Sequence, residues 1–287
     1  MRDLSAGLAH LAINTATLRK QLDLPAIVEA CVRRGIPSLC PWRDQVASAG
    51  LANVARHLKD AAMTLSGYCR GGFFPAADAV GLRAALDDNR RAIDEAKTLG
   101  APCLVLVVGA LPGALQGRPA HKDIGLARAQ VVDGIAATLA YARQVGMPLA
   151  IEPLHPMQAA DRACINTTEH ALDVCDALDP NRTGTLGVAI DVYHTWWDPK
   201  LEGQIARAGR DRLLAYHVCD WLLPTSDLVN DRGMMGDGIV ELKKIRGFLE
   251  AAGYAGPVEV EIFSERWWRE PAETVLDTCV ARYHTVV

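Results

Sequence analysis

The chain has 287 residues, half of them hydrophobic, and its 30 basic and 34 acidic residues give a net charge of −4. This balance argues against a nucleic-acid surface, which would need a basic stripe, and no apolar stretch approaches the length of a membrane span. The eight cysteines are scattered without a C-x-x-C pair, and the first residues lack the apolar region of a signal peptide. We therefore expect reduced thiols in a cytoplasmic protein.

Short apolar runs alternate with longer amphipathic stretches, and the alternation occurs eight times along the chain. The predicted strands are Leu8–Ile13, Ile36–Cys40, Met63–Tyr68, Cys103–Val108, Pro148–Glu152, Leu186–Asp191, Leu213–Val218 and Val258–Ile262. The predicted helices include Leu24–Arg34, Leu82–Leu99, Ile124–Val145, Thr168–Leu178, Leu242–Ala252 and Ala272–His284. Several of these helices end at a glycine shortly before the next strand, as in R-R-G-I-P and Q-V-G-M-P, which is typical of a left-handed helix terminus.

This order predicts an α/β fold in which residues 1–287 form one domain, a (β/α)8 TIM barrel. A doubly wound open sheet is the alternative, but no G-x-G-x-x-G follows the first predicted strand. In a barrel the C-terminal strand ends surround one opening, where the active site is expected.

Four of the later strands end in a side chain that can bind a metal ion, namely Glu152, Asp191, His217 and Glu261. A charged residue at the end of a buried strand needs a partner that offsets its desolvation. Three carboxylates and one imidazole form a mostly oxygen donor set, which suits Mn²⁺, Mg²⁺, Co²⁺ or Zn²⁺. We predict one divalent ion, with Mn²⁺ as the first choice. For any one of these acids alone, a pair with an arginine remains the alternative.

Polar residues that end the earlier strands are expected to face the same cavity: Asn14, Trp42, Arg43, Tyr68 and Arg70. Trp42 and the other five tryptophans lie near predicted strand ends, where aromatic faces suit a sugar or polyol. Arg43 and Arg70 could bind a carboxylate or phosphate, although rim arginines are common. We predict substrate contacts for Trp42 and Arg43.

Two histidines follow the predicted ligands by the same interval: His155 after Glu152 and His194 after Asp191. We predict substrate contacts for both. A hydrogen bond to a metal ligand is the alternative for His155, and packing against nearby tryptophans is the alternative for His194. Glu259 shares a strand face with Glu261 and remains a candidate for a structural ion pair.

At these residues the chain resembles the xylose-isomerase-like barrel superfamily, most closely its inosose (2-keto-myo-inositol) isomerase branch. The resemblance is specific from Pro148 to Val287, where the order Glu, Asp-x-x-His, His, Glu recurs, and a G-D-G-I-V-E-L segment at Gly236–Leu242 also resembles the family. It implies that Glu152, Asp191, His217 and Glu261 are the metal ligands and that His194 contacts the substrate.

Two departures from the family pattern bear on the reaction. The segments E-P-L-H-P and H-V-C-D-W-L-L lack the asparagine and the arginine of some ketose epimerases, which argues against a simple ketohexose epimerase. The remaining histidines form no convincing second zinc cluster of the endonuclease IV kind.

The sequence thus predicts a metal-dependent isomerase or epimerase of a small keto-sugar or keto-polyol, acting through an enediolate. Glu152 and Glu261 are the expected acid and base. The alternative is a lyase or dehydratase that eliminates water or an aglycone from a 3-keto-sugar or 3-keto-glycoside. A non-catalytic sugar-binding subunit and an abasic-site nuclease are more remote. We expect a small-molecule sugar or polyol substrate and no nucleic-acid or membrane partner. A homo-oligomer is left open, and Trp267 and Trp268 are the residues predicted at its interface.

Overall fold

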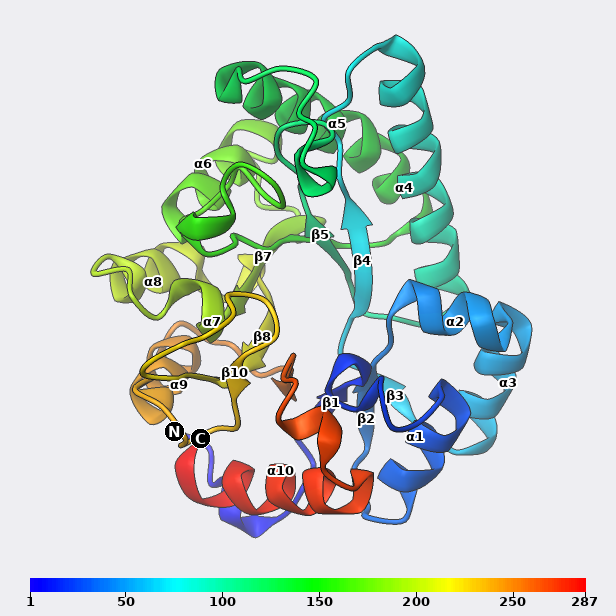
Figure 1. Cartoon of the computed structure of the whole chain (residues 1–287), viewed down its shortest axis with the longest axis vertical. Helices are drawn as coiled ribbons and strands as arrows, with labels where there is room; N and C mark the ends of the chain where they lie inside the picture. Colours follow the sequence, from blue (N-terminus) through cyan, green and yellow to red (C-terminus); the bar gives the residue numbers. More distant parts are fainter.

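Nine parallel strands form one curved sheet in the computed structural model, which describes residues 1–287 (Figure 1). Their order in the sheet is β3-β2-β1-β11-β8-β7-β6-β5-β4. A parallel bridge between Trp42 and Cys69 connects the end of β2 to β4, so that the ring closes and the predicted TIM barrel is confirmed. The strands are β1 (Leu11–Asn14), β2 (Ser38–Cys40), β3 (Thr64–Leu65), β4 (Tyr68–Gly72), β5 (Leu104–Val107), β6 (Leu149–Ile151), β7 (Leu186–Asp191), β8 (Leu213–Val218) and β11 (Val258–Val260).

The third barrel strand differs from the prediction, because it is divided into β3 and β4 and continues to Gly72. The sequence of β4, Y-C-R-G-G, has no apolar run and therefore gave no strand signal. A Cβ atom at Gly72 would lie 2.0 Å from the carbonyl oxygen of Val107 in β5. Glycine thus allows the two backbones to approach closely at this end of the barrel.

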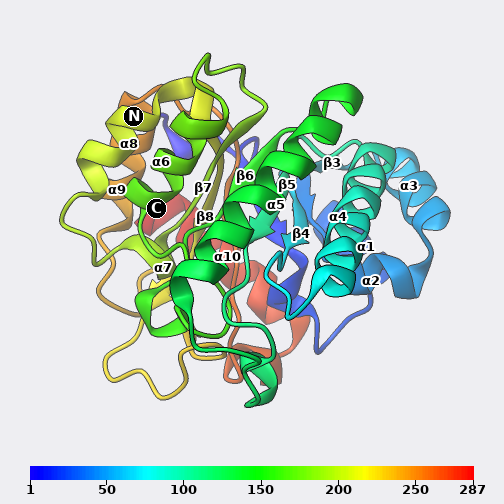
Figure 2. The ribbon, with the colours of Figure 1, turned by 90° about the horizontal axis from the view of Figure 1, so that it is seen from above.

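Helices cover the outside of the barrel, and all six predicted ones are present. Neighbouring helices such as α4 and α5 pack side by side (Figure 2). Gly100 and Gly146 end these two helices in the left-handed conformation, as predicted. The helices are α1 (Leu24–Val32), α2 (Arg43–Ala49), α3 (Leu51–Asp60), α4 (Ala79–Leu99), α5 (Ile124–Val145), α6 (Thr168–Leu178), α7 (Val192–Thr195), α8 (Leu201–Arg212), α9 (Leu242–Ala251) and α10 (Ala272–Val286).

The interior of the barrel is filled by small side chains. The cluster consists of Cys40, Cys69, Cys103, Val105, Ala150, Ala189 and Ala215. All eight cysteines of the chain are free and buried, as the thiol prediction requires. A larger apolar core lies between the strands and the helices.

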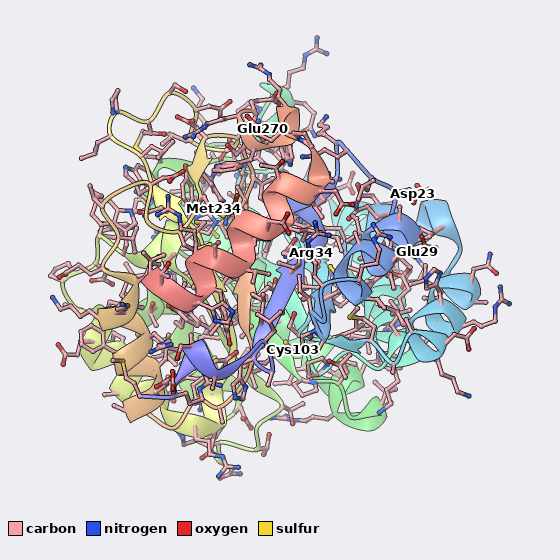
Figure 3. The ribbon with its side chains drawn as sticks, turned by 90° about the horizontal axis from the view of Figure 1, so that it is seen from below. Asp23, Glu29, Arg34, Cys103, Met234 and Glu270 are labelled. Atoms are coloured by element: carbon pink, nitrogen blue, oxygen red, sulfur yellow. The ribbon has the colours of Figure 1, made fainter.

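Between β8 and α9 the chain forms a long excursion over the C-terminal opening. Within it β9 (Asp220–Trp221) pairs antiparallel with β10 (Arg232–Gly233). On the outside of the barrel α10 packs next to the N-terminal segment (Figure 3), where Nδ1 of His284 lies 2.7 Å from the carbonyl oxygen of Leu4. None of the helices combines the length and the apolar character needed to cross a bilayer.

Candidate metal centre

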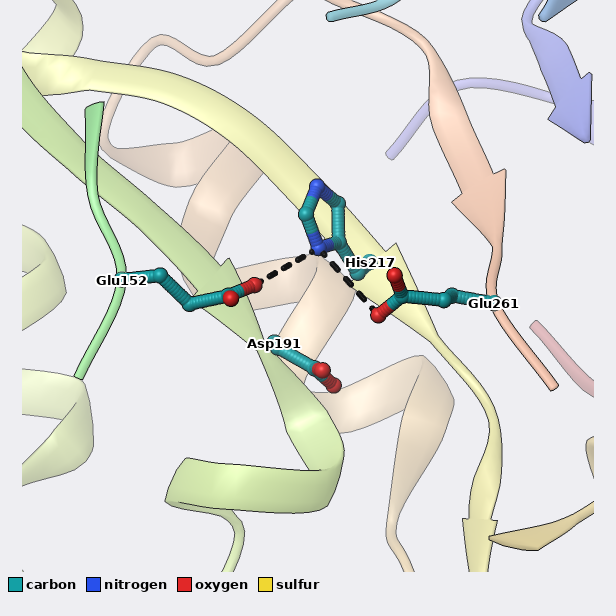
Figure 4. A group of neighbouring side chains, drawn as sticks. All are labelled: Glu152, Asp191, His217 and Glu261. Carbon is teal, nitrogen blue, oxygen red and sulfur yellow. Dashed lines mark ion pairs between the residues drawn. The ribbon is translucent and has the colours of Figure 1, made fainter. Parts of the chain in front are cut away.

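The structure brings the four predicted ligands together at the opening of the barrel (Figure 4). Glu152 follows β6, Asp191 ends β7, His217 lies in β8 and Glu261 follows β11. These strands are consecutive in the sheet, and Asp191 is in register with His217. One donor atom from each residue lies within 4.8 Å of the others, and none of the four residues is more than 6% exposed.

The imidazole of His217 lies between two of the carboxylates. Its Nδ1 is 3.0 Å from Oε1 of Glu152 and 3.8 Å from Oε2 of Glu261 (Figure 4). The short contact to Glu152 does not have the alignment of a hydrogen bond, so both atoms are buried without a well-formed partner. Buried polar atoms normally have partners, and these are oriented so that a cation could bind both.

The charges in this cluster act strongly on one another. Burial opposes protonation of His217, but the carboxylates of Glu259, Glu152 and Glu261 raise its pKa well above the ordinary value. Burial raises the pKa of Glu261 to about 8, although Arg232 and His217 act in the opposite direction. For Asp191, burial is outweighed by the charges of Arg232 and His194, which lower its pKa.

Arg232 is a site residue that the sequence analysis did not identify. Its Nη1 donates to Oδ2 of Asp191 at 2.8 Å and to Oε2 of Glu261 at 3.0 Å. Only 6% of this residue is exposed. No arginine directly follows His217 in the sequence, but β10 supplies a guanidinium from later in the same excursion. The segment H-V-C-D-W-L-L lacks an arginine, but the site still contains a guanidinium, that of Arg232.

His194 lies beside these groups at the start of the chain segment after β7. Its Nδ1 accepts the backbone N–H of His155 at 3.0 Å. Its Nε2 lies 3.2 Å from Nη2 of Arg232 and 3.6 Å from Oδ2 of Asp191, and the residue lines the cavity. Burial, assisted by the charge of Arg232 and only partly offset by Asp191, lowers the pKa of His194 to about 3. The imidazole is therefore neutral.

The ring of His155 lies elsewhere. It stacks on Trp221 with the ring centroids 4.8 Å apart and does not line the cavity. Only the backbone of His155 contacts the site, because its N–H donates a hydrogen bond to the ring of His194.

The cavity next to the four ligands has a volume of about 260 Å³ and includes Trp42 in its wall. The indole N–H of Trp42 donates to Oδ1 of Asn14 at 2.7 Å, and its ring contacts Phe263 edge-on. A larger surface hollow of about 580 Å³ lies between α1 and α3, but none of the predicted ligands lines it.

Arg43 and Tyr68 point away from this cavity. The guanidinium of Arg43 bonds Asp88 and Glu95 of α4, and the hydroxyl of Tyr68 donates to Glu95 at 3.0 Å. Trp42 and Arg43 are adjacent in the chain, so that one faces the barrel opening and the other the helices. We therefore retain Trp42, and not Arg43, as a candidate substrate contact.

Glu259 lies one layer below Glu261, on the other side of the His217 ring. Its carboxylate accepts from Nδ2 of Asn14 and from Oγ of Ser66, both at 2.8 Å. It is 1% exposed and faces Nε2 of His217. Trp267 and Trp268, predicted to form an interface, are instead 8% exposed and pack within the chain: Trp267 belongs to the apolar core, and the indole N–H of Trp268 donates to the carbonyl oxygen of Ala16.

Comparison with known proteins gives a consistent family assignment. Residues 27–279 match the family described as xylose isomerase-like TIM barrel. An inosose isomerase of Bacillus velezensis (strain DSM 23117 / BGSC 10A6 / LMG 26770 / FZB42) is 23% identical over 285 residues, which cover 96% of each chain.

Two solved structures share the fold over nearly the whole chain. Protein SMc04130 from Sinorhizobium meliloti 1021 is 55% identical, with a TM-score of 0.92 and coverage of 98% of this chain and 99% of that one. The IolI protein with a bound zinc atom is 20% identical, with a TM-score of 0.81 and coverage of 97% and 98%. At that identity the second comparison establishes the fold alone.

Proposed function

The chain belongs to the xylose isomerase-like TIM barrel family, and from this premise we propose that it is a divalent-metal-dependent isomerase or epimerase of a small keto-sugar or keto-polyol. The observation that carries the proposal is the convergence of three carboxylates and one imidazole within 4.8 Å, all buried at the barrel opening. The similarity to an inosose isomerase makes inosose the first substrate to test.

The side chains present fit a divalent cation. Nδ1 of His217 and Oε1 of Glu152 are buried without well-aligned hydrogen bonds, so these donor atoms are free to bind a metal ion. Hard oxygen donors with one imidazole suit Mn²⁺, Mg²⁺, Co²⁺ or Zn²⁺, and we favour Mn²⁺. Glu152, Asp191, His217 and Glu261 would hold the ion.

Once bound, the ion would stabilise the negative charge that develops on the substrate oxygen when a proton leaves the neighbouring carbon. The proton itself needs an acceptor and a donor from the protein. Glu152 and Glu261 lie on either side of His217 (Figure 4), so one carboxylate can take a proton from one carbon while the other returns a proton to its neighbour.

His194 and Arg232 line the cavity beside these carboxylates. The neutral ring of His194 lies against Arg232, with Nε2 3.2 Å from Nη2 of the guanidinium. The guanidinium of Arg232 lies at the same wall and offers N–H groups that carry a fixed positive charge. Aromatic side chains such as Trp42 and Phe263 exclude water, which strengthens these electrostatic interactions.

A lyase remains the second candidate because it would use the same proton abstraction. Loss of a leaving group from the next carbon would then eliminate water or an aglycone. The aromatic wall formed by Trp42, Phe73 and Phe263 favours this reading, since aromatic rings pack well against a ring-shaped leaving group. The multi-zinc nuclease alternative is not carried further, because the residues that could hold a metal form a single group.

The proposal is tested by incubating the protein with inososes and keto-sugars in D₂O. Deuterium entering the position next to the carbonyl, with the composition of the product unchanged, is the result we expect. An unsaturated product or a released aglycone would replace the isomerase with the lyase. Absence of exchange with every keto-sugar and inosose, in protein shown to contain its metal, would contradict both.

A further inference from the structure

Two arginines in the wall of the active-site cavity have no acidic partner. Arg70 comes from β4 and Arg162 from the segment between β6 and α6, and both side chains are half-buried. Neither guanidinium forms an ion pair or a hydrogen bond within the chain. The other two arginines of this wall do: Arg19 pairs with Asp44, and Arg232 pairs with Asp191 and Glu261.

Arg70 is held in place by aromatic rings instead of by a carboxylate. The guanidinium carbon lies 4.1 Å from the ring centre of Phe73 and 5.7 Å from that of Trp42. Such stacking fixes the plane of the guanidinium and leaves its N–H edges free for a ligand.

The two positive charges are unfavourable for each other. Burial lowers the pKa of Arg70 to about 10, and the charge of Arg162 acts in the same direction. A desolvated charge without a partner costs free energy, and two like charges in one cavity add to that cost. An anion bound between them would relieve both effects and would form charge-assisted hydrogen bonds.

A neutral polar group lies in the same wall. Gln158 is 5% exposed, its Nε2 donates to the carbonyl oxygen of Leu228 at 3.2 Å, and its Oε1 is buried without a partner. The wall of the cavity thus combines two positive charges with a neutral polar side chain.

We propose that the substrate carries an oxyanion group, a carboxylate or a phosphate ester, which Arg70 and Arg162 bind while the keto-alcohol end faces the four acidic and imidazole ligands. The keto-alcohol part of this inference rests on the proposed function; the oxyanion part rests on the two arginines. It narrows the substrate class to keto-sugar acids or keto-sugar phosphates. A neutral inosose is then expected to bind more weakly than these anionic keto-sugars.

The test uses three ligands that share a keto-sugar chain: D-fructose, 2-keto-D-gluconate and D-fructose 6-phosphate. Dissociation constants are measured by calorimetry on the metal-loaded protein. We expect at least one of the two anions to bind about tenfold tighter than fructose or more, because hydrogen bonds to charged groups are worth more than neutral ones. Whichever anion is preferred identifies the source of the oxyanion.

Variants assign the preference to the two arginines, since an anion can also bind the metal ion itself. R70Q and R162Q should each remove most of the preference, whereas R83Q, at an exposed arginine of α4, should keep it. Arg162 lies outside the sheet, so its variant remains informative if R70Q folds poorly. Equal affinities for the three ligands in the unaltered protein, or a preference retained in R162Q and in folded R70Q, would overturn the proposal.

The outcome is separable from that of the proposed function. If anions bind more tightly than fructose in an arginine-dependent way but no deuterium exchange occurs, the isomerase proposal is rejected and the oxyanion site is retained. If a neutral inosose exchanges deuterium and anions do not bind more tightly than fructose, the isomerase proposal is retained and the oxyanion site is rejected.

Discussion

His217 and Glu259 face each other across neighbouring strands, with Nε2 of the imidazole 3.5 Å from Oε1 of the carboxylate. The two residues are register partners of β8 and β11. Asn14 and Ser66 each donate a hydrogen bond to Glu259 and hold its carboxylate in position. The contact places a negative charge beside Nε2 of His217, and the other ring nitrogen, Nδ1, is directed at the carboxylates of Glu152 and Glu261.

The variant E259Q should therefore weaken metal binding although Glu259 is not one of the four ligands. Partners that orient a metal-binding histidine typically change metal affinity by about 10- to 100-fold. The dissociation constant for Mn²⁺ is measured by calorimetry, with E265Q, at an exposed acid of the same region, as the matched control. An unchanged dissociation constant in folded E259Q would show that Glu259 has no role in orienting His217.

Replacing a predicted metal ligand should affect proton transfer as well as metal binding, unlike the replacement of Glu259. The variant E261Q should abolish deuterium exchange and also weaken Mn²⁺ binding, because the amide supplies neither a negative charge nor a proton acceptor. The fold should persist, as judged by far-UV circular dichroism, because Arg232 keeps its ion pair with Asp191. Full exchange activity in E261Q would exclude Glu261 from proton transfer.

Metal affinity should increase as the pH rises from about 6 to about 8. Without the ion, the pKa of His217 is raised by the surrounding carboxylates and that of Glu261 is raised by burial to about 8. Both groups are therefore protonated at the acidic end of this range, and the metal must displace these protons to bind. The change is at most about tenfold per pH unit for each proton released. Titrations with Mn²⁺ in buffers of matched ionic strength would measure it, and a pH-independent affinity would contradict the assignment of these ligands.

Arg232 should stabilise the protein most when the metal has been removed. In R232Q the buried carboxylate of Asp191 loses the guanidinium that lies 2.8 Å away. We expect the free energy of unfolding of chelator-treated protein to fall by about 2 to 4 kcal/mol. Added Mn²⁺ should then raise the melting temperature of R232Q more than that of the unaltered protein, because the ion supplies the missing positive charge. R83Q is the control, and equal shifts in all three proteins would refute this role.

The positions of the four ligands could be predicted because each one follows a regular signal. A run of buried apolar residues ends at an acid or a histidine, and parallel strands of one barrel bring such ends together. Asp191 ends β7 as predicted, whereas Glu152 and Glu261, predicted to lie within strands, directly follow the shorter β6 and β11. The helices α5 and α6 also have the predicted bounds, since amphipathic periodicity and a capping Asp123 or Thr167 define them.

The remaining parts of the site depend on tertiary contacts that leave no periodic signal. Arg232 comes from a two-residue strand in an irregular excursion, which is too short for a pattern of alternation. Trp42 and Arg43 are neighbours at a strand end, and the sequence alone does not tell which one faces the opening. The backbone of β4 approaches β5 so closely that glycine is needed there. These glycines take the place of apolar side chains, so the sequence of β4 lacks the apolar run that would predict a strand.

The central claim is that one divalent ion binds between the four ligands, and anomalous diffraction from crystals grown with Mn²⁺ tests it most directly. The account predicts a single strong anomalous peak per chain within bonding distance of Glu152, Asp191, His217 and Glu261. A barrel opening without such a peak at saturating Mn²⁺, or a peak bound by other residues, would contradict it.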